Sequence, residues 1–597
     1  NVYGGGAMGS VTGGTTVNIS GKSVIGADGS GGGYVYAASR GYDDMGEGFA
    51  AVASTALNIS GGTIWGSAFG GGQLGTVKGS VAVNVSGGVV KNDVYGGGAL
   101  ANTNTDNWNT VGSATTYVSV AGLATETHRV KEMAIGASVA GLYTYDSGTS
   151  TYVAAAGTAE EGVVYYEKLS GAPVAGYYTE SAGKYTRITN STTTADGVTT
   201  YYKKVVAGSW ADGKNDPSTG TTYKTTVSLT GGLVGNVYGG GLGNTTTMAN
   251  VYGDVTVTVN QGVTDPTKGV AFIQQTESPT IGGTVYPTPV SGRVFGGNNH
   301  NGTPTGNITV HVYSTRQLDS DDNILPGHGY PDRKYSYEIQ SVYGGGNQAD
   351  YMPADGKQRH VIIDGCNETS IEKVYGGGNS AVVPETDVLI NGAYDIGYAF
   401  GGGNGDKPIK LDNGTWRENE GAIVIGLASI VCQGGKIGQV FGGGDAKGSC
   451  GNTNAVTKQV GDCPLHITRL YGAGNKGDVS SVNIVLAACS ESAIDYVHGG
   501  SYNAHVHGDV HLTITSGILK NVYGGNDARG GIEGNIIVDI EETNGCNPII
   551  IQNLVGGGNE APYPGTKTNN EGVEVPIGTH GKITVNVKSA TYIGEIS

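Results

Sequence analysis

The chain has few of the features that mark the commonest functional classes. It contains 34 Lys and Arg residues against 51 Asp and Glu residues in 597, which gives a formal net charge of −17. No basic stripe could neutralise a phosphate backbone, so the composition argues against nucleic acid as a partner. The same charge disfavours binding to anionic membrane surfaces. No apolar run approaches the length of a membrane span, so we expect no direct membrane insertion.

Recognisable catalytic and cofactor motifs are also missing. The Gly-Gly-Gly-Asn phrases are not phosphate-binding loops, because no Gly-Lys-Ser/Thr follows them and no helix opens after them. The six cysteines include no CxxC pair, which disfavours a zinc site. The acidic residues lie mainly in variable stretches between the repeats. We therefore expect a protein that is not an enzyme and that uses no cofactor.

Glycine, with 108 residues, is abundant and is concentrated in a repeated phrase that reads Val-Tyr-Gly-Gly-Gly. Clear copies begin at Val2, Ala68, Val94, Val237, Val294, Val342, Val374, Ala399, Val440, Leu470, Val497, Val522 and Leu554. Weaker copies begin at Val35, Ala134 and Tyr592. The tightest spacing, from 374 to 399, is 25 residues. A short period of this kind is typical of a solenoid, in which each repeat is one turn of chain stacked on the next.

Alternating β-branched stretches precede most copies of the phrase. Examples are residues 81–85, 255–259 and 583–587. Apolar residues at every second position place one face of a strand against a core and the other toward solvent. The sequence therefore predicts an all-β fold, a parallel β-helix (β-solenoid) of about 15 rungs with a small β-rich insertion.

Two positions of the phrase are predicted to form structural ladders along the solenoid axis. The aromatic position is occupied by Tyr95, Tyr238, Tyr343, Tyr375, Phe400, Phe441, Tyr471 and Tyr523. The polar position after the glycines is occupied by Asn347, Asn379, Asn404, Asn475 and Asn559. We expect the rings to stack in the core, although a row of sugar-stacking rings is the alternative. The Asn side chains either hydrogen bond from rung to rung or only tolerate a turn conformation.

The glycines themselves are expected to serve the sharp corner of each rung. Glycine reaches positive φ without steric cost and leaves room for the backbone of the next rung. Extra residues collect after the phrase, at 379–387, 404–420, 445–462 and 559–580. Two further expansions, 263–290 and 315–338, follow the alternating strand. Insertions that share one corner line one edge of a solenoid, and that edge is the usual interaction face.

The largest insertion divides the chain into three segments, namely solenoid rungs over 1–138, the insertion over 139–222 and further rungs over 223–597. The insertion is duplicated internally, since residues 141–144 match 176–179 and residues 162–168 match 197–203. Its tyrosines, here considered for binding a sugar or a protein, are Tyr143, Tyr165, Tyr166, Tyr178, Tyr201 and Tyr202. The alternative is that these rings form the small cores of two β-hairpin units.

The cysteines suggest one disulfide. Cys450 and Cys463 bracket residues 451–462 and are predicted to close a loop. Four others, Cys366, Cys432, Cys489 and Cys546, each precede a copy of the phrase by 8 residues and are expected to stay unpaired at equivalent corners. A disulfide indicates an extracellular compartment.

The Tyr/Phe-Gly-Gly-Gly-Asn corners and Val-x-Val-x-Val strands resemble the β-solenoid stalks of autotransporter passengers, polymorphic outer-membrane proteins and filamentous-haemagglutinin-like adhesins. The Tyr-rich insertion looks like modules of large surface proteins of gut Bacteroidota. The resemblance implies an exported, bacterial cell-surface protein that is structural or adhesive, with a host or neighbouring-cell glycan or protein as partner.

Two other functions remain open, namely a β-helix carbohydrate-active enzyme (a lyase or glycosidase) and a phage tailspike. A glycosidase would need paired carboxylates at a defined separation. Neither end of the chain shows a cap, so we expect end-to-end self-association or covalent continuation of the solenoid in a larger surface or filament-forming protein.

Overall fold

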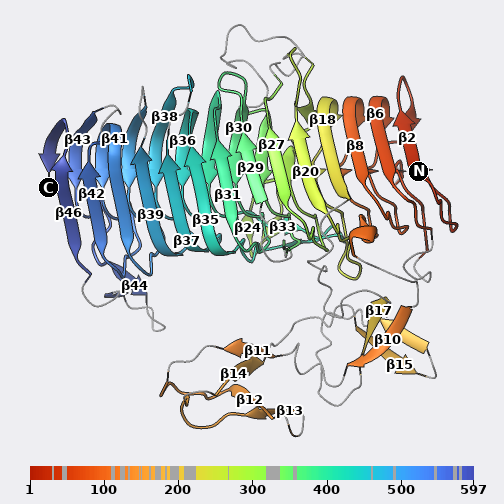
Figure 1. The fold of residues 1–597 in the computed structure, drawn as a ribbon, viewed down its shortest axis with the longest axis horizontal. Helices are drawn as coiled ribbons and strands as arrows, with labels where there is room; N and C mark the ends of the chain where they lie inside the picture. Colours follow the sequence, from red (N-terminus) through yellow and green to blue (C-terminus); the bar gives the residue numbers. More distant parts are fainter. Residues whose placement is uncertain are drawn as a thin grey trace. The chain divides into compact units, whose positions relative to one another are not determined.

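A computed structural model of the chain describes residues 1–29, 32–42, 50–108, 115–120, 128–131, 135–146, 148, 151–160, 163–168, 177–181, 184–187, 201–206, 223–265, 268–316, 337–351, 353, 359–458, 461–487, 492–543, 548–568, 574–576 and 581–596. The chain divides into two compact units. The first comprises Asn1–Trp108 and Asn215–Ser597, and the second comprises Asn109–Lys214. The predicted all-β parallel solenoid is confirmed for the first unit, whose strands stack side by side in chain order (Figure 1).

One stack of parallel strands, here the aromatic sheet, carries the repeated phrase. Each copy in this stack from Val2 to Leu554 pairs with the next in register, so that Val237 lies between Val94 and Val294. Tyr592 pairs with Ile550 and not with Leu554, so the weak copy predicted there is out of register with the phrase. Val35–Tyr36, a weaker copy in the sequence, occupies a regular place in this stack. The strands in stacking order are β1 (Val2–Tyr3), β4 (Val35–Tyr36), β7 (Ala68–Phe69), β9 (Val94–Tyr95), β19 (Val237–Tyr238), β26 (Arg293–Phe295), β28 (Ile339–Tyr343), β30 (Ser370–Tyr375), β32 (Asp395–Phe400), β36 (Gly435–Phe441), β38 (Leu465–Tyr471), β40 (Ala493–His498), the second half of β41 (Val510–Tyr523), β43 (Ile549–Val555) and β47 (Tyr592–Ile596).

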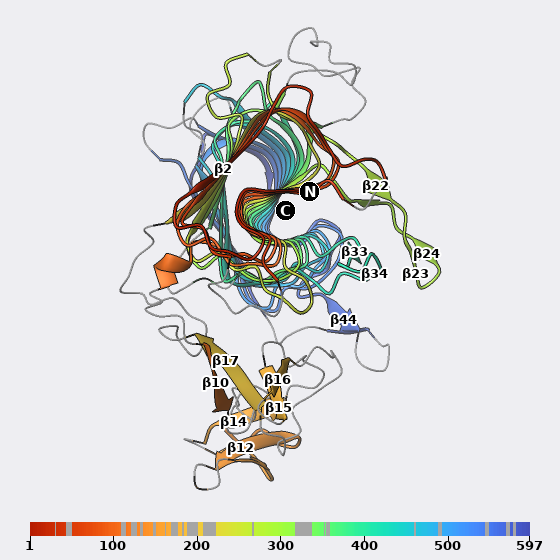
Figure 2. The same ribbon diagram turned by 90° about the vertical axis from the view of Figure 1, so that its right-hand side faces the viewer.

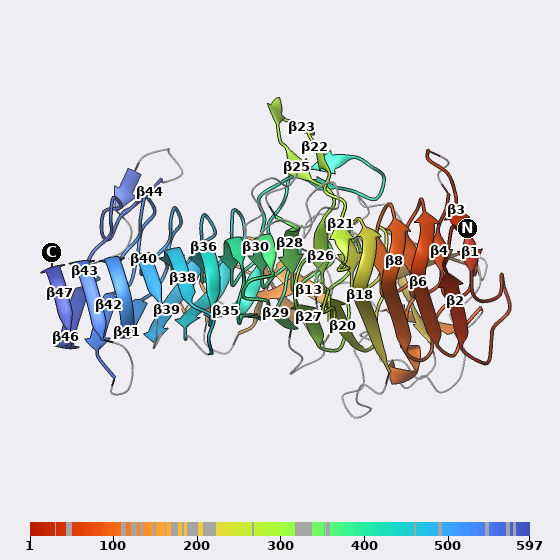
Figure 3. The ribbon, with the colours of Figure 1, turned by 90° about the horizontal axis from the view of Figure 1, so that it is seen from above.

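A second stack, here the alternating sheet, is built from the β-branched stretches (Figure 3). Its burial alternates along each strand, because side chains of a strand point to opposite faces. The strands are β2 (Thr15–Ile19), β3 (Val24–Ile25), β6 (Thr55–Ile64), β8 (Val81–Val90), β18 (Lys224–Val234), β20 (Asp254–Val259), β21 (Ala271–Phe272), β27 (Ile308–Val312), β29 (Arg359–Ile363), β31 (Thr386–Ile390), β35 (Val424–Cys432), β37 (Cys450–Thr457), β39 (Val479–Ala487), the first half of β41, β42 (Ile536–Glu541) and β46 (Ile583–Ser589).

Isolated parallel bridges join many of the turns on a third side. Val77 lies between Val52 and Thr103, for example, and Val506 lies between Val479 and Ile532. Seen along the axis, the strands of successive rungs superpose around a narrow interior (Figure 2). That interior is one continuous cluster of buried Val, Ile, Leu and Ala side chains. A thin core of this kind suits a solenoid, in which each rung contacts only its neighbours.

Of the two roles predicted for the glycine triplet, the structure bears out the close approach of backbones but not the positive φ. Positive φ occurs within strands β6, β8 and β18 of the alternating sheet, at Gly62, Gly88 and Gly232, whereas Gly376–Gly378 of the phrase are not among the described glycines with positive φ. A Cβ atom built on Gly376 would overlap the carbonyl oxygen of Gly401 in the next rung. The triplet is therefore glycine because successive backbones approach closely, not because the corner needs a left-handed conformation.

Short antiparallel hairpins project from the rungs. They are β22 (Thr276–Glu277) with β25 (Thr288–Pro289), β23 (Thr280–Ile281) with β24 (Thr284–Val285), β33 (Ile409–Lys410) with β34 (Trp416–Arg417), and β44 (Thr566–Thr568) with β45 (Glu574–Pro576). Two of the four expansions predicted after the phrase, 404–420 and 559–580, contain a hairpin. The other two are part of the regular rungs, since 445–462 contains strand β37 and 379–387 contains the start of β31 and Val383, which bridges to Val424. Residues 317–336, which make up most of the 315–338 expansion, lie outside the described residues.

The predicted disulfide between Cys450 and Cys463 is wrong. Cys450 begins β37, and an eight-residue strand is about 26 Å long, so the two cysteines flank opposite ends of a strand. Cys463 is instead bonded to Cys366, with 5.8 Å between their Cα atoms. Cys432 and Cys450 are free and buried, and Cys489 and Cys546 lie outside the described residues.

The second unit contains two four-stranded antiparallel sheets with equivalent strand order. One has the order β10 (Thr115–Val120), β17 (Tyr201–Val206), β15 (Tyr177–Ser181), β16 (Lys184–Arg187), and the other β11 (His128–Lys131), β14 (Tyr165–Lys168), β12 (Leu142–Asp146), β13 (Thr151–Ala154). The unit starts earlier than the predicted boundary at 139, because β10 and β11 pair with strands of the duplicated segment. In the sequence, all four strands of the β11, β14, β12, β13 sheet lie between β10 and β15 of the other sheet.

Candidate ligand-binding groove beside the aromatic stack

The rings of the phrase form one continuous stack on the aromatic sheet. From Tyr3 to Tyr523, neighbouring ring centroids are 4.5–5.0 Å apart and the ring planes are within 13° of parallel. His498 occupies one place in the stack, between Tyr471 and Tyr523. Most of these rings are buried, so their faces pack against each other. A row of sugar-stacking rings is not available at this position, because each face is already covered.

The asparagines after the glycines form hydrogen-bonded ladders beside the ring stack. Each amide Nδ2 donates to the Oδ1 of the preceding rung, over 2.8 Å from Asn347 to Asn299 and 2.7 Å both from Asn379 to Asn347 and from Asn404 to Asn379. Two shorter ladders join Asn475 to Asp445 and Asn559 to Asp527. The ladder is interrupted at Asp445 because a carboxylate has no N–H to donate to Asn404.

The tyrosine hydroxyls connect the ring stack to these ladders. Tyr375 Oη lies 3.1 Å from Asn404 Oδ1 and 2.9 Å from Asp445 Oδ2. Tyr471 Oη donates to Asp527 Oδ2 at 2.8 Å. Burial and the nearby Asp445 carboxylate raise the pKa of Tyr375 well above its usual value, so this phenol stays protonated and acts as a donor.

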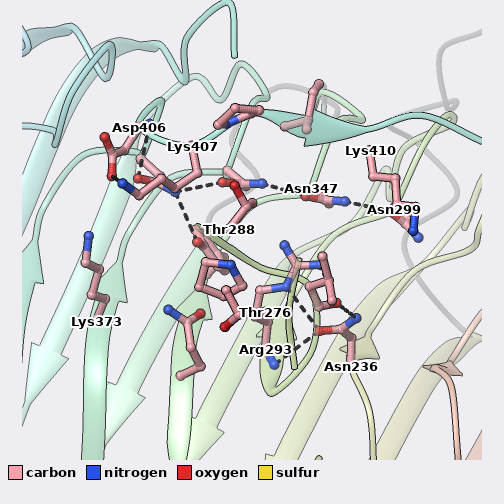
Figure 4. Close-up of a pocket in the computed structure, with 18 of the residues that line it drawn as sticks. Asn236, Thr276, Thr288, Arg293, Asn299, Asn347, Lys373, Asp406, Lys407 and Lys410 are labelled. Atoms are coloured by element: carbon pink, nitrogen blue, oxygen red, sulfur yellow. Dashed lines mark hydrogen bonds and ion pairs between the residues drawn. The ribbon is translucent and has the colours of Figure 1, made fainter. Parts of the chain in front are cut away.

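A pocket of about 490 Å³ lies where the ladders face two of the hairpins (Figure 4). Its floor comes from the aromatic sheet, through Arg293, Gln340 and Lys373. The ladder amides form one wall, and residues of the 276–289 and 406–416 segments enclose the pocket from outside. The two hairpins arise from different corners of the rung, since one follows the alternating strand and the other follows the phrase. Their convergence on one groove was not predicted.

A polar row on the floor of the pocket also escaped the sequence analysis. Asp93, Asn236 and Arg293 each stand one residue before a copy of the phrase and stack in successive rungs. Asn236 Nδ2 donates to Asp93 Oδ1 at 2.9 Å, and Arg293 Nε donates to Asn236 Oδ1 at 3.1 Å. Burial raises the pKa of Asp93, while hydrogen bonds from Asn236 and Tyr95 oppose that shift. The signal that could have found this row is its constant place ahead of the phrase.

The basic side chains of the pocket are held in ion pairs or hydrogen bonds. Lys373 Nζ donates to Asp445 Oδ2 at 3.1 Å, and burial alone would lower its pKa, but the Asp445 and Asp406 carboxylates outweigh that effect and raise it. Lys407 Nζ lies 3.4 Å from Asp406 Oδ2. Lys410 Nζ bonds to both carboxylate oxygens of Glu277, at 2.7 and 2.9 Å, and so joins the two hairpins.

Further along the aromatic sheet, exposed tyrosines offer ring edges, not ring faces. Tyr398 is 37% exposed, but its plane is within 11° of the plane of Phe400 in the stack. One face of its ring is approached by Lys373 Nζ, 5.6 Å from the centroid. Arg469 lies over the ring of Tyr496 in the same way, at 5.2 Å. These rings are not positioned as a platform for a sugar.

In the second unit, the tyrosines considered for binding are paired across strands. Tyr143 lies opposite Tyr166, and Tyr178 lies opposite Tyr202 at the equivalent place in the other sheet. Tyr165 is buried with Val139 and Ala159, and thus belongs to a small core. Tyr201 lies opposite Val120, and the side chains of Tyr178, Tyr201 and Tyr202 lie outside the described part of the structure.

The described residues contain no group of three His, Cys, Asp or Glu side chains placed to hold a metal ion. Over the same described ranges, no helix has the length and apolar character of a membrane span. Comparisons with protein-family models, with curated proteins and with solved structures give no match to this chain.

Proposed function

We propose that this chain is a non-catalytic, structural and adhesive β-solenoid of about fifteen rungs, a segment of a larger extracellular surface or filament-forming protein. The observation that carries the proposal is the pocket enclosed by two hairpins beside an otherwise regular stack. The regular stack supports a structural role because its rings, amides and backbones repeat the same contacts in each rung. The hairpins support a binding role, because non-repetitive segments on a rigid scaffold are where recognition residues usually lie.

The proposal is tested by binding and cleavage measured together on one panel. The purified chain is applied to immobilised glycans and to bacterial and host surface proteins, and bound ligands are then incubated with it and analysed for shortened products. We expect retention of at least one ligand and no change in ligand length. Cleavage would replace the proposal with the carbohydrate-active enzyme, and absence of any binding would remove the adhesive role.

A matched pair of loop variants locates the binding site. Replacing residues 406–420 by a short Gly-Ser link removes the β33–β34 hairpin and should abolish binding. The same replacement of residues 566–576 removes the β44–β45 hairpin, which does not line the pocket, and should leave binding intact. Equal loss in both variants would place the ligand elsewhere.

We also propose that the chain associates end to end with a second copy through its outermost rungs. In β46, the core-facing Ile583 and Val587 are 37% and 44% exposed, whereas their partners Ile536 and Ile540 in β42 are fully buried. An open strand edge with exposed apolar side chains is a template for another strand. Light scattering that shows a monomer at high concentration would argue against self-association.

A further inference from the structure

We infer that the pocket between the hairpins takes a segment of an uncharged oligosaccharide. This inference rests on the proposed adhesive function and adds the chemical class of the ligand. The volume of about 490 Å³ is within the range of about 300–1,000 Å³ usual for small-molecule sites. The ion pair between Lys410 and Glu277 joins the hairpins above the pocket, so the enclosure is formed before any ligand enters.

The first argument is that the three lysines of the pocket are already paired with carboxylates and that Arg293 already donates to two oxygen atoms of the protein. Lys373, Lys407 and Lys410 each have a carboxylate partner within 3.4 Å. Arg293 donates from Nε to Asn236 and from Nη2 to the carbonyl oxygen of Val290 at 3.0 Å. A carboxylated or sulfated ligand would lose its hydration and would have to compete with these partners. An uncharged ligand carries a smaller desolvation cost.

The second argument is the regular array of amides along the wall. Within the ladder, Asn347 and Asn379 each use one N–H to donate to the preceding rung and one acceptor site to receive from the next. An amide has two N–H donors and two acceptor lone pairs, so each keeps one donor and one acceptor site. Both side chains are more than 90% buried and line the pocket.

These remaining donor and acceptor sites recur at the spacing of the rungs, about 4.8 Å. Hydroxyl groups of a sugar both donate and accept hydrogen bonds, and they recur along a saccharide chain. Thr276 and Thr288 add hydroxyl groups from one hairpin, although the Thr288 hydroxyl already donates to the carbonyl oxygen of Tyr286 at 2.9 Å. Trp416 adds an indole ring from the other hairpin, with Lys410 Nζ 5.8 Å from the ring centroid. A mixed donor and acceptor wall with one aromatic ring matches a neutral sugar better than a single charged group.

The test uses the full chain and two series of oligosaccharides of equal length, one built from neutral hexoses and the other from uronic acids. Isothermal titration calorimetry measures the Kd of each in about 50 mM and about 500 mM salt. We expect a neutral oligosaccharide to bind at least about tenfold more tightly than its acidic counterpart. We expect its Kd to change by less than about twofold between the two salt concentrations.

Two variants extend the test. Trp416→Ala should weaken binding of the neutral ligand by about tenfold or more, whereas Lys407→Gln should leave it within about twofold, since no ionic contact to the ligand is lost. Circular dichroism checks that both variants are folded. Tighter binding of the acidic series, with a steep salt dependence and a loss in Lys407→Gln, would overturn the inference and leave the adhesive function standing. Failure of every saccharide to bind would overturn the inference, and a protein ligand found on the panel would then keep the adhesive function.

Discussion

At the scale of single residues, each place in the repeated phrase has one physical task. The glycines permit close approach of successive backbones, the rings stack, and the asparagines hydrogen bond along the axis. Substitutions within the phrase follow the same requirements. Asp527 replaces Asn as an acceptor from Asn559, and His498 replaces a phenol ring as another flat ring.

The first prediction concerns the glycine triplet. Gly376→Ala should destabilise the solenoid by about 1–3 kcal/mol, because the new methyl group overlaps the backbone of the next rung and the backbone cannot move freely. Gly13→Ala is the matched control, since a Cβ there meets no atom within 4 Å. Urea unfolding of both variants measures the difference. Equal stability of the two variants would contradict the close-approach role.

The second prediction concerns pH. Burial lowers the pKa of His498 to about 4, with the nearby Asp527 carboxylate opposing and Arg469 adding to the shift. The unfolded chain, with a histidine pKa near 6.5, therefore binds a proton between about pH 6.5 and 4 that the folded chain does not. The stability that neutral His498 contributes is present above pH 6.5 and is lost as the pH falls toward 4.

The variant His498→Tyr removes this titration and retains a ring in the stack. Its free energy of unfolding relative to the wild type should rise by up to about 3 kcal/mol between pH 7 and pH 4. Denaturant unfolding at several pH values measures this difference. A difference that does not vary with pH would show that His498 is protonated equally in the folded and unfolded chain.

At the scale of elements, corner length decides which segments meet. Cys366 and Cys463 lie in connections between a strand of the alternating sheet and the following strand of the aromatic sheet. These two connections are longer than the same connections in the two rungs that lie between them, and the disulfide crosses the shorter ones. Gly392 and Gly434 lie beneath it, since Cβ atoms built there would come within 3.0 Å of Cys463 Sγ and 2.8 Å of Cys463 Cβ. The bond therefore ties together rungs that are not direct neighbours.

The third prediction is that the double variant Cys366→Ser/Cys463→Ser unfolds more readily by about 2–4 kcal/mol. Closing a loop between residues 97 positions apart restricts the unfolded chain, and that restriction is lost in the variant. Reducing agent should destabilise the wild type and have no effect on the variant. Peptide mapping without reduction that recovers a Cys450–Cys463 linkage would contradict the pairing.

At the scale of the whole molecule, the solenoid of the first unit, here called the rod, is continuous at the point in the chain where the second unit is inserted. Strand β8 pairs directly with β18, with Val81 opposite Thr225. Asn107 closes the base of the insertion, since its Nδ2 donates to the carbonyl oxygen of Tyr223 at 2.6 Å and its Oδ1 accepts from Tyr223 N at 2.9 Å. The two chain ends of the insertion are thus held by contacts that belong to the rod.

The fourth prediction follows from this arrangement. Replacing residues 109–222 by a short Gly-Ser link should change the stability of the rod by no more than about 0.5 kcal/mol. Thermal unfolding monitored by far-UV circular dichroism compares the two proteins. Failure of the shortened chain to fold, with Asn107 and Tyr223 intact, would show that the insertion is required to form the rod.

The sequence by itself determined the all-β solenoid and the residues of the ring stack, and it named the asparagines of the ladder except Asn299 while leaving open whether they bond to one another. These depend on contacts between equivalent positions of neighbouring rungs, so the period of the repeat is enough to identify them. It also indicated the duplicated insertion, although the first strands of its two sheets, β10 and β11, lack the repeated pattern and were missed.

Only the tertiary structure decided the partner of Cys463 and the convergence of two hairpins on one pocket. Each of these depends on the lengths of several corners together, because every added residue shifts where a loop lies relative to rungs further along the axis. The residue pattern within one repeat does not give the combined length of several corners. The repeat therefore identifies the rod, while its irregular segments determine where a ligand can bind.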